Sequence, residues 1–164
     1  MQSWNEIVQR NAANVLNAAL RVLGNLADAE DVSQEVFTEA FRKWDAQPYT
    51  QWEGILRRMA VFRSIDLLRS KKNTQTLSMD LPDDKNSPIS NAISRELAHR
   101  LRIEIGNLPP RESQVFCLTY FEQQTAEQIA QSLDISKPSV ATALSKARAK
   151  LELAFRKIST GEPK

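Results

Sequence analysis

Residues 28–44 read DAEDVSQEVFTEAFRKW, and this stretch has the periodicity of an amphipathic helix. Its apolar residues recur at helical spacing on one stripe, which comprises Val32, Val36, Phe37, Ala40, Phe41 and Trp44. The opposite face carries a compact acidic and hydrogen-bonding patch of Asp31, Gln34, Glu35 and Thr38. Two interpretations are open at this point. The patch is either a solvated face near an acidic helix start or a docking surface for a basic partner.

The composition predicts an all-α protein with modest hydrophobic cores. Only 4 of the 164 residues are glycine, which argues against a turn-rich β fold, and 41% are hydrophobic. The net charge of +2 is far from the strongly basic footprint of a nonspecific nucleic-acid binder, so only local basic patches could bind nucleic acid. The single cysteine, Cys117, cannot form an intramolecular disulfide and indicates a reducing cytoplasm. No apolar run approaches the roughly 18 residues of a membrane span.

The N-terminal part of the chain predicts two further helices around this stretch. An apolar stripe that starts at Trp4 predicts a first helix that stops near Gly24. Another helix is predicted from about Glu53 to Ser70, and Arg57 and Arg58 lie in its first half. Basic residues late in a helix complement its dipole, but residues in the first half do not, so these two arginines need another explanation.

The segment between these helices, residues 45–54, reads DAQPYTQWEG and has no helical period. It predicts a loop in which Tyr49 and Trp52 are exposed. Aromatic rings beside cations are the chemistry that single-stranded nucleic acid requires, because rings stack on unpaired bases while cations bind phosphates.

A linker is predicted at residues 73–94, which are polar and acidic, contain two prolines and have no regular period. It would divide the chain into two small helical domains, residues 1–72 and 95–164. The second domain is predicted to begin with a helix from about Ala92 to Ile105 and to continue with a helix after the motif LPPRE at residues 108–112.

Residues 125–151, TAEQIAQSLDISKPSVATALSKARAKL, predict a helix-turn-helix. Thr125 and Gln128 have the spacing of a capping box, Asp134 suits a left-handed turn, and Ser136 can cap the next helix. The second helix is expected to bury Val140, Leu144, Ala147 and Leu151. Small and basic residues would then face outward, as in a helix that enters the major groove. The alternative is two helices that merely pack at a turn.

The order of these parts resembles an extracytoplasmic-function sigma factor of bacterial RNA polymerase. The most specific motifs are DAED-x-x-QE-x-F at residues 28–37, ID-x-x-R at residues 65–69 and LP-x-RE at residues 108–112. The resemblance implies an initiation factor that recruits core polymerase to promoters. It also implies that residues 73–94 thread toward the active-site cleft of the polymerase.

The resemblance further implies roles for individual residues, which we state as expectations. The residues expected to bind the clamp helices of the largest polymerase subunit are Asp31, Gln34, Glu35, Thr38 and Arg42. The residues expected to hold the melted minus-ten element are Tyr49, Trp52, Arg57, Arg58 and Arg63. The residues expected to read the minus-thirty-five element are Lys137, Ser139, Thr142, Ser145, Lys146, Arg148 and Lys150.

The recognition helix departs from the family at Ala141 and Ala143, where lysine or arginine is common. Fewer charged readers should weaken or change the base preference, since each good bidentate contact contributes about 1 to 3 kcal/mol of discrimination.

Two other function classes remain to be compared with this one. An autonomous helix-turn-helix regulator would bind duplex DNA through residues 108–155 and dimerise through its N-terminal domain. An enzyme has little support, because the sequence has no nucleophile with a paired base, no phosphate-binding glycine loop and no metal cluster. We therefore expect no catalytic residue, cofactor or metal. The expected partners are core RNA polymerase and promoter DNA, and the sequence leaves open whether an anti-sigma protein binds as well.

Overall fold

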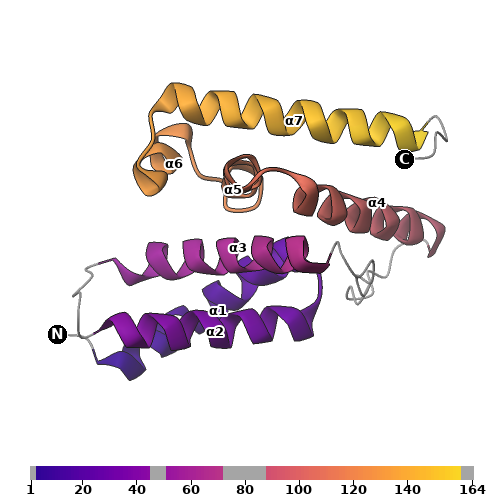
Figure 1. The fold of residues 1–164 in the computed structure, drawn as a ribbon. Coiled ribbons are helices and arrows are strands. Elements are labelled where there is room, and N and C mark those ends of the chain that lie inside the picture. The colour runs from indigo at the N-terminus through magenta and orange to yellow at the C-terminus, as the bar shows by residue number, and fades with distance from the viewer. Residues whose placement is uncertain (1–2, 45–50, 72–87, 160–164) are drawn as a thin grey trace.

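The computed structural model describes residues 3–44, 51–71 and 88–159, which form seven α-helices and no strand. The helices are α1 (Trp4–Leu23), α2 (Leu26–Trp44), α3 (Trp52–Lys71), α4 (Pro88–Asn107), α5 (Pro110–Tyr120), α6 (Ala126–Leu133) and α7 (Lys137–Ser159). α3 forms the middle layer (Figure 1): α1 and α2 pack against one side of it, and α4 and α5 against the other. α6 and α7 lie beyond α5. The all-α prediction is confirmed.

The first two helices start and stop where local chemistry dictates. Ser3 caps α1 and forms a capping box with Glu6. Gly24 ends α1 in the left-handed conformation, with φ of 66°, and its N–H donates to the Leu20 carbonyl at 2.7 Å. The Asn25 side chain then accepts from the Asp28 N–H at 3.0 Å, which satisfies a donor in the first turn of α2. The short turn between them makes α1 and α2 neighbours.

An aromatic cluster closes one end of the α1–α3 bundle. The Trp4 ring lies 6.0 Å from the Trp52 ring and 5.4 Å from the Phe41 ring, measured between centroids. Trp52 is only 6% exposed. The expectation that Trp52 is an exposed loop aromatic is therefore wrong, because it is the first residue of α3 and its ring packs against Trp4. Tyr49 lies outside the described residues.

The helix-turn-helix prediction is confirmed in its local details. Thr125 and Gln128 form the capping box of α6, and Asp134 ends the helix in the left-handed conformation with φ of 55°. The Ser136 hydroxyl accepts from the Ser139 N–H at 3.2 Å, so it caps α7. Together these contacts fix the turn that orients α7 relative to α6.

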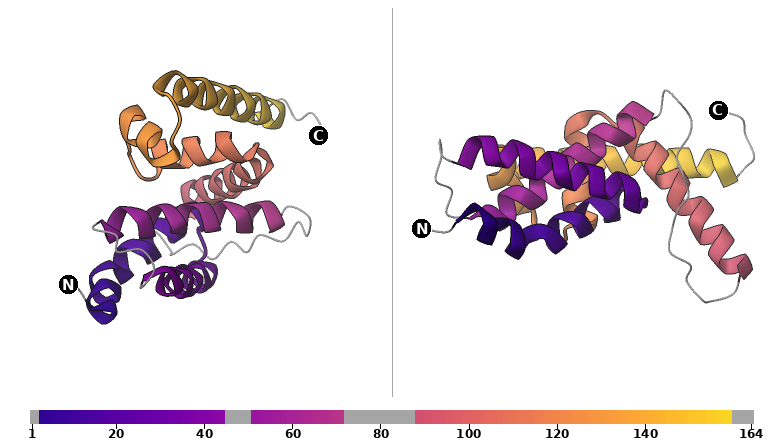
Figure 2. Two further views of the ribbon diagram at one scale, coloured as in Figure 1. Left: turned by 60° about the vertical axis from the view of Figure 1, so that its left-hand side comes forward. Right: turned by 90° about the horizontal axis from the view of Figure 1, so that it is seen from below.

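α4 begins earlier than the sequence pattern indicates. It starts at Pro88 rather than near Ala92, so residues 88–94 of the predicted linker are helical. Proline suits a first helical turn, because its missing N–H would have no partner inside the helix. The N-terminal part of α4 extends past the body of the molecule (Figure 2). Residues 72–87 lie outside the described residues, and the division into domains stays a prediction.

The two halves of the chain pack closely where α4 approaches α3. A Cβ built on Gly106 would lie 3.0 Å from the Leu68 carbonyl oxygen, so the absence of a side chain permits this approach. The adjacent Ile105 and Leu108 are buried, and they belong to one hydrophobic core that continues through Leu68. Apolar packing thus holds the second half of the chain against α3.

Candidate functional site

The acidic face of α2 is exposed and forms one wall of a groove. Asp31, Gln34, Glu35, Thr38 and Arg42 are all exposed on α2. They line a groove of about 820 Å³ together with Glu39, Lys43 and Arg63, and we call this the α2 groove. Val32, Val36 and Ala40 are buried on the opposite side of the helix. The structure therefore brings together all five residues expected to bind core polymerase.

Arg63 lies in this groove, apart from the other residues expected to bind the minus-ten element. Its guanidinium donates a hydrogen bond to Glu39 of α2. This hydrogen bond lowers the pKa of Glu39 and raises the pKa of Arg63. Lys43 also donates to Glu39, at 3.2 Å. Glu39 therefore joins the basic residues Arg63 and Lys43 to the acidic face of α2. The sequence alone did not point to Glu39.

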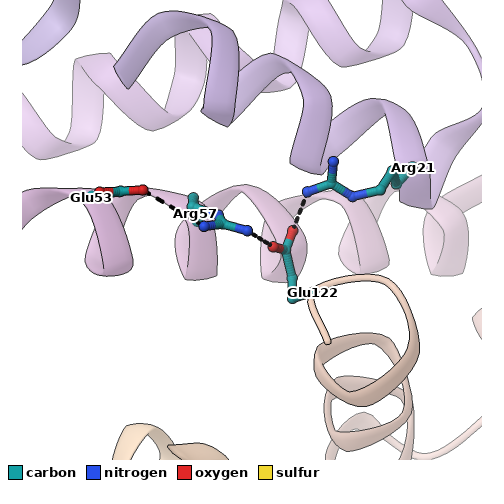
Figure 3. Close-up of polar contacts among 4 residues, drawn as sticks. All are labelled: Arg21, Glu53, Arg57 and Glu122. Atoms are coloured by element: carbon teal, nitrogen blue, oxygen red, sulfur yellow. Dashed lines mark hydrogen bonds and ion pairs between the residues drawn. The ribbon is translucent and has the colours of Figure 1, made fainter. Parts of the chain in front are cut away.

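Arg57 and Arg58 lie on the first half of α3, and Arg57 borders a hollow of about 450 Å³. Arg57 lines the hollow with Arg10 and Gln51. Its guanidinium pairs with Glu53 in the same helix at 3.7 Å and with Glu122 at 2.5 Å (Figure 3). Arg58 donates to the Ser132 carbonyl oxygen at 2.9 Å. Both arginines thus contact residues from the other half of the chain.

A second groove, of about 370 Å³, lies between the start of α5 and the start of α7, and we call it the α5–α7 groove. It is lined by Arg111, Glu112, Pro138, Ser139, Thr142, Ala143 and Lys146. The groove carries two cations, Arg111 and Lys146, one carboxylate, Glu112, and the small hydroxyl groups of Ser139 and Thr142. Cations of this kind can contact phosphates, and hydroxyl groups can contact base edges.

The remaining predicted reader residues are exposed on α7, but two of them contact α5. The Arg148 guanidinium donates to the Tyr120 hydroxyl and lies 5.4 Å from the centre of that ring. Lys150 pairs with Glu112 at 2.8 Å. Lys137 and Ser145 are exposed. Ala143 is 7% exposed and lines the α5–α7 groove, whereas Ala141 is exposed on α7.

Metal-ion and membrane features are absent from the described part of the chain. Within residues 3–44, 51–71 and 88–159, His, Cys, Asp and Glu side chains do not gather in groups of three that could hold a metal ion. Among the described helices, none has both the length and the apolar character needed to cross a membrane.

Two family models match the chain, one in its N-terminal half and one in its C-terminal half. The model "Sigma-70 region 2" matches residues 7–74, which span α1 to α3 and the α2 groove. The model "Sigma-70, region 4" matches residues 99–151, which include the helix-turn-helix. The chain belongs to the sigma-70 family. These matches give no support to the alternative of an autonomous helix-turn-helix regulator.

This sigma-70 family member is similar to several characterised proteins. "ECF RNA polymerase sigma factor SigE" of Mycolicibacterium smegmatis is 29% identical over 159 residues, covering 92% of this chain and 61% of that protein. "ECF RNA polymerase sigma factor SigW" of Bacillus subtilis is 27% identical, with 92% and 88% covered. "RNA polymerase sigma-E factor" of Streptomyces coelicolor is 24% identical, with 90% and 83% covered. The chain thus spans less than two thirds of the first of these relatives.

Sequence reasoning missed two kinds of residue in this sigma-70 family member. Glu39 and Lys43 extend the face that begins at Asp31 and Glu35, and a helical count in steps of four would have found them. Glu122 had no local signal, because its partners Arg21 and Arg57 lie 101 and 65 residues away along the chain.

Proposed function

We propose that this sigma-70 family member acts in the cytoplasm, binds core RNA polymerase and directs it to promoters, without catalysing a reaction itself. The observation that carries the proposal is that one chain holds both matched regions, region 2 around the α2 groove and region 4 around the helix-turn-helix. With both regions in one chain, the protein can contact polymerase through one surface and promoter DNA through others.

The α2 groove is the surface that docks on the clamp helices of the largest polymerase subunit. Asp31 and Glu35 stand one helical turn apart on the exposed face, so they can pair with a row of basic residues on a partner helix. Gln34 and Thr38 add hydrogen-bonding groups to the same face, although the Thr38 hydroxyl already donates to the Gln34 carbonyl at 2.7 Å. Arg42 and Arg63 would orient the partner, because they place positive charge at one end only.

Promoter DNA is bound by two separate surfaces in this proposal. Arg57 and Arg58 bind the phosphates of the melted minus-ten strand. An unstacked base of that strand enters the hollow that Arg57 lines. Trp52 is buried and supports this surface rather than stacking on bases. The α5–α7 groove reads the minus-thirty-five element, with Thr142 and Lys146 as the central contacts.

Core-polymerase capture tests the docking surface. The variant Asp31→Lys/Glu35→Lys reverses two charges on the α2 groove, and we expect it to lose capture by purified core polymerase. The matched control, Glu127→Lys/Glu152→Lys, makes the same change in net charge at two exposed glutamates of α6 and α7 and should be captured normally. Undiminished capture of the first variant, with both proteins folded by circular dichroism, would show that the docking face lies elsewhere.

Transcription from genomic template fragments tests the function as a whole. The wild-type protein with core polymerase should initiate at discrete promoters, and Arg57→Ala/Arg58→Ala should reduce open-complex formation while leaving polymerase capture intact. Initiation at no site on any fragment would reject the proposal.

A further inference from the structure

One carboxylate joins the two halves of the chain. The Glu122 side chain lies just after α5 and is only 2% exposed. Its two oxygens accept from Arg21 of α1 at 3.0 Å and from Arg57 of α3 at 2.5 Å, and both guanidinium groups point toward it (Figure 3). A buried carboxylate is costly unless it is paired and hydrogen-bonded, so these arginines are what make Glu122 stable at this position.

The neighbouring arginine of α3 is held by the same half of the chain. Arg58 donates to the Ser132 carbonyl oxygen in α6. The two arginines that the proposed function assigns to minus-ten DNA are therefore both occupied when the C-terminal half packs on α3. A carboxylate and a phosphate offer a guanidinium the same chemistry, two acceptor oxygens with negative charge. In this geometry Glu122 already takes one guanidinium nitrogen of Arg57, and its negative charge would repel a phosphate brought to the same group.

We propose that Glu122 is an intramolecular competitor of promoter DNA, and that the arrangement described here is a closed form of the free protein. Opening it would release Arg57 and Arg58 together and free the helix-turn-helix to reach a separate DNA element. This inference rests on the proposed function of Arg57 and Arg58.

Other contacts stabilise the closed form without involving the minus-ten surface. Arg69 of α3 donates to the Leu108 carbonyl at 2.9 Å, and Arg102 of α4 donates to the Val22 carbonyl at 3.0 Å. They add to the apolar packing around Leu68 and Gly106. Glu122 and the Ser132 carbonyl are therefore the contacts that couple closure to DNA binding, and Glu122 is the one that carries a charge.

The test uses the full chain and two matched variants. Glu122→Gln keeps the size of the side chain and removes its charge. The control, Glu96→Gln, makes the same change at an exposed glutamate of α4 that is not one of the carboxylates paired with Arg57. Fluorophores on Asn14→Cys and Gln131→Cys, both exposed, report the distance between α1 and α6 by energy transfer. Cys117 is buried and should stay unlabelled. A dye-labelled random pool of short single-stranded DNA measures binding.

We expect Glu122→Gln to lengthen the distance between the fluorophores and to tighten single-stranded DNA binding by about threefold or more, because apparent affinity scales with the open fraction. Glu96→Gln should do neither. Arg21→Ala removes one arm of the same contact without changing the C-terminal half, so it should act like Glu122→Gln even if the latter folds poorly.

An unchanged distance in both Glu122→Gln and Arg21→Ala would overturn the inference. So would a longer distance with unchanged DNA affinity, and Arg57→Ala in the Glu122→Gln background then tells which idea has failed. If that change weakens DNA binding, the proposed role of Arg57 stands and only the competition is wrong. If it has no effect, Arg57 does not bind the strand and the proposed function of this surface is wrong.

Discussion

Arg63 of α3 donates a hydrogen bond to Glu39 of α2, and this pair joins the basic and acidic parts of the α2 groove. Glu39 lies one helical turn after Glu35, in a row of acidic side chains on the same helix. The pair links α2 to α3 across the groove, between two partly exposed side chains. Arg63 therefore belongs with the α2 groove by position.

Acid should weaken this pair. The Arg63 hydrogen bond holds the pKa of Glu39 below its usual value, so its stabilisation is complete above the unfolded-state pKa of about 4.3 and is lost as the pH falls through the lower folded-state value. At neutral pH, Glu39→Gln should reduce the free energy of unfolding by about 0.5 kcal/mol or less, because the pair is partly exposed. Urea unfolding at neutral pH and in acid measures the difference, which should shrink as the pH falls through the lowered folded-state pKa of Glu39.

The control for that experiment is Glu96→Gln, which changes an exposed glutamate of α4. It should leave stability nearly unchanged at both pH values, since isolated surface substitutions rarely have larger effects. An equal loss of stability for Glu39→Gln at neutral and acid pH would mean that packing, and not the charge of Glu39, holds the pair.

Two glycines in helices should respond in opposite ways to alanine. At Gly106 a Cβ would meet the Leu68 backbone carbonyl at 3.0 Å, and a backbone oxygen cannot move aside cheaply. We expect Gly106→Ala to lower the free energy of unfolding by about 1–3 kcal/mol. At Gly54 a Cβ would meet nothing within 4 Å, so Gly54→Ala should raise stability by roughly 0.5–1 kcal/mol. Thermal unfolding of both variants measures these changes in stability. An equal change in stability for the two variants would contradict the close approach of α4 to α3.

Cys117 should be inert in the folded protein. Its side chain is buried in α5, and burial raises the pKa of its thiol well above the usual value. The reactive thiolate is therefore scarce even at alkaline pH. A colorimetric thiol reagent should leave the native protein unmodified at about pH 8 and react fully in denaturant, whereas Asn14→Cys should add one fast-reacting thiol in the native state. Fast modification of the native wild type would show that α5 opens readily.

Local features were predictable from the sequence because the atoms that decide them are close along the chain. The cap at Thr125 and the left-handed turn at Asp134 depend on residues within four positions, and both were predicted correctly. The exposed face that begins at Asp31 was also predictable, since helical periodicity fixes which residues share a face.

Features that depend on distant contacts were not predictable in this way. Trp52 follows a polar segment and looked exposed, but the packing of α3 on α1 brings Trp4 against its ring. Ala143 is buried in addition to Val140 and Ala147, because a packed helix uses both three- and four-residue steps. The packing of the second half of the chain on α3 depends on Glu122 and on the close approach at Gly106, and neither has a periodic signal.

Two lysines on α7 should separate DNA binding from stability. Lys146 is exposed and lines the α5–α7 groove, so Lys146→Ala should leave stability within about 0.5 kcal/mol of wild type. Lys150 pairs at 2.8 Å with Glu112, whose side chain is 12% exposed. Lys150→Ala would leave that carboxylate without its partner and should cost about 1–2 kcal/mol.

Promoter binding by the reconstituted polymerase should be affected more by Lys146→Ala than by Lys150→Ala, the reverse of their effects on stability. If Lys146 binds a phosphate, Lys146→Ala should lower the slope of log affinity against log salt by about 0.9, the value for one lost contact on duplex DNA. Lys150→Ala should leave that slope unchanged when binding is measured at a temperature low enough for this less stable variant to be fully folded. A loss of slope in Lys150→Ala with none in Lys146→Ala would place the phosphate contact at Lys150, outside the α5–α7 groove that Lys146 lines.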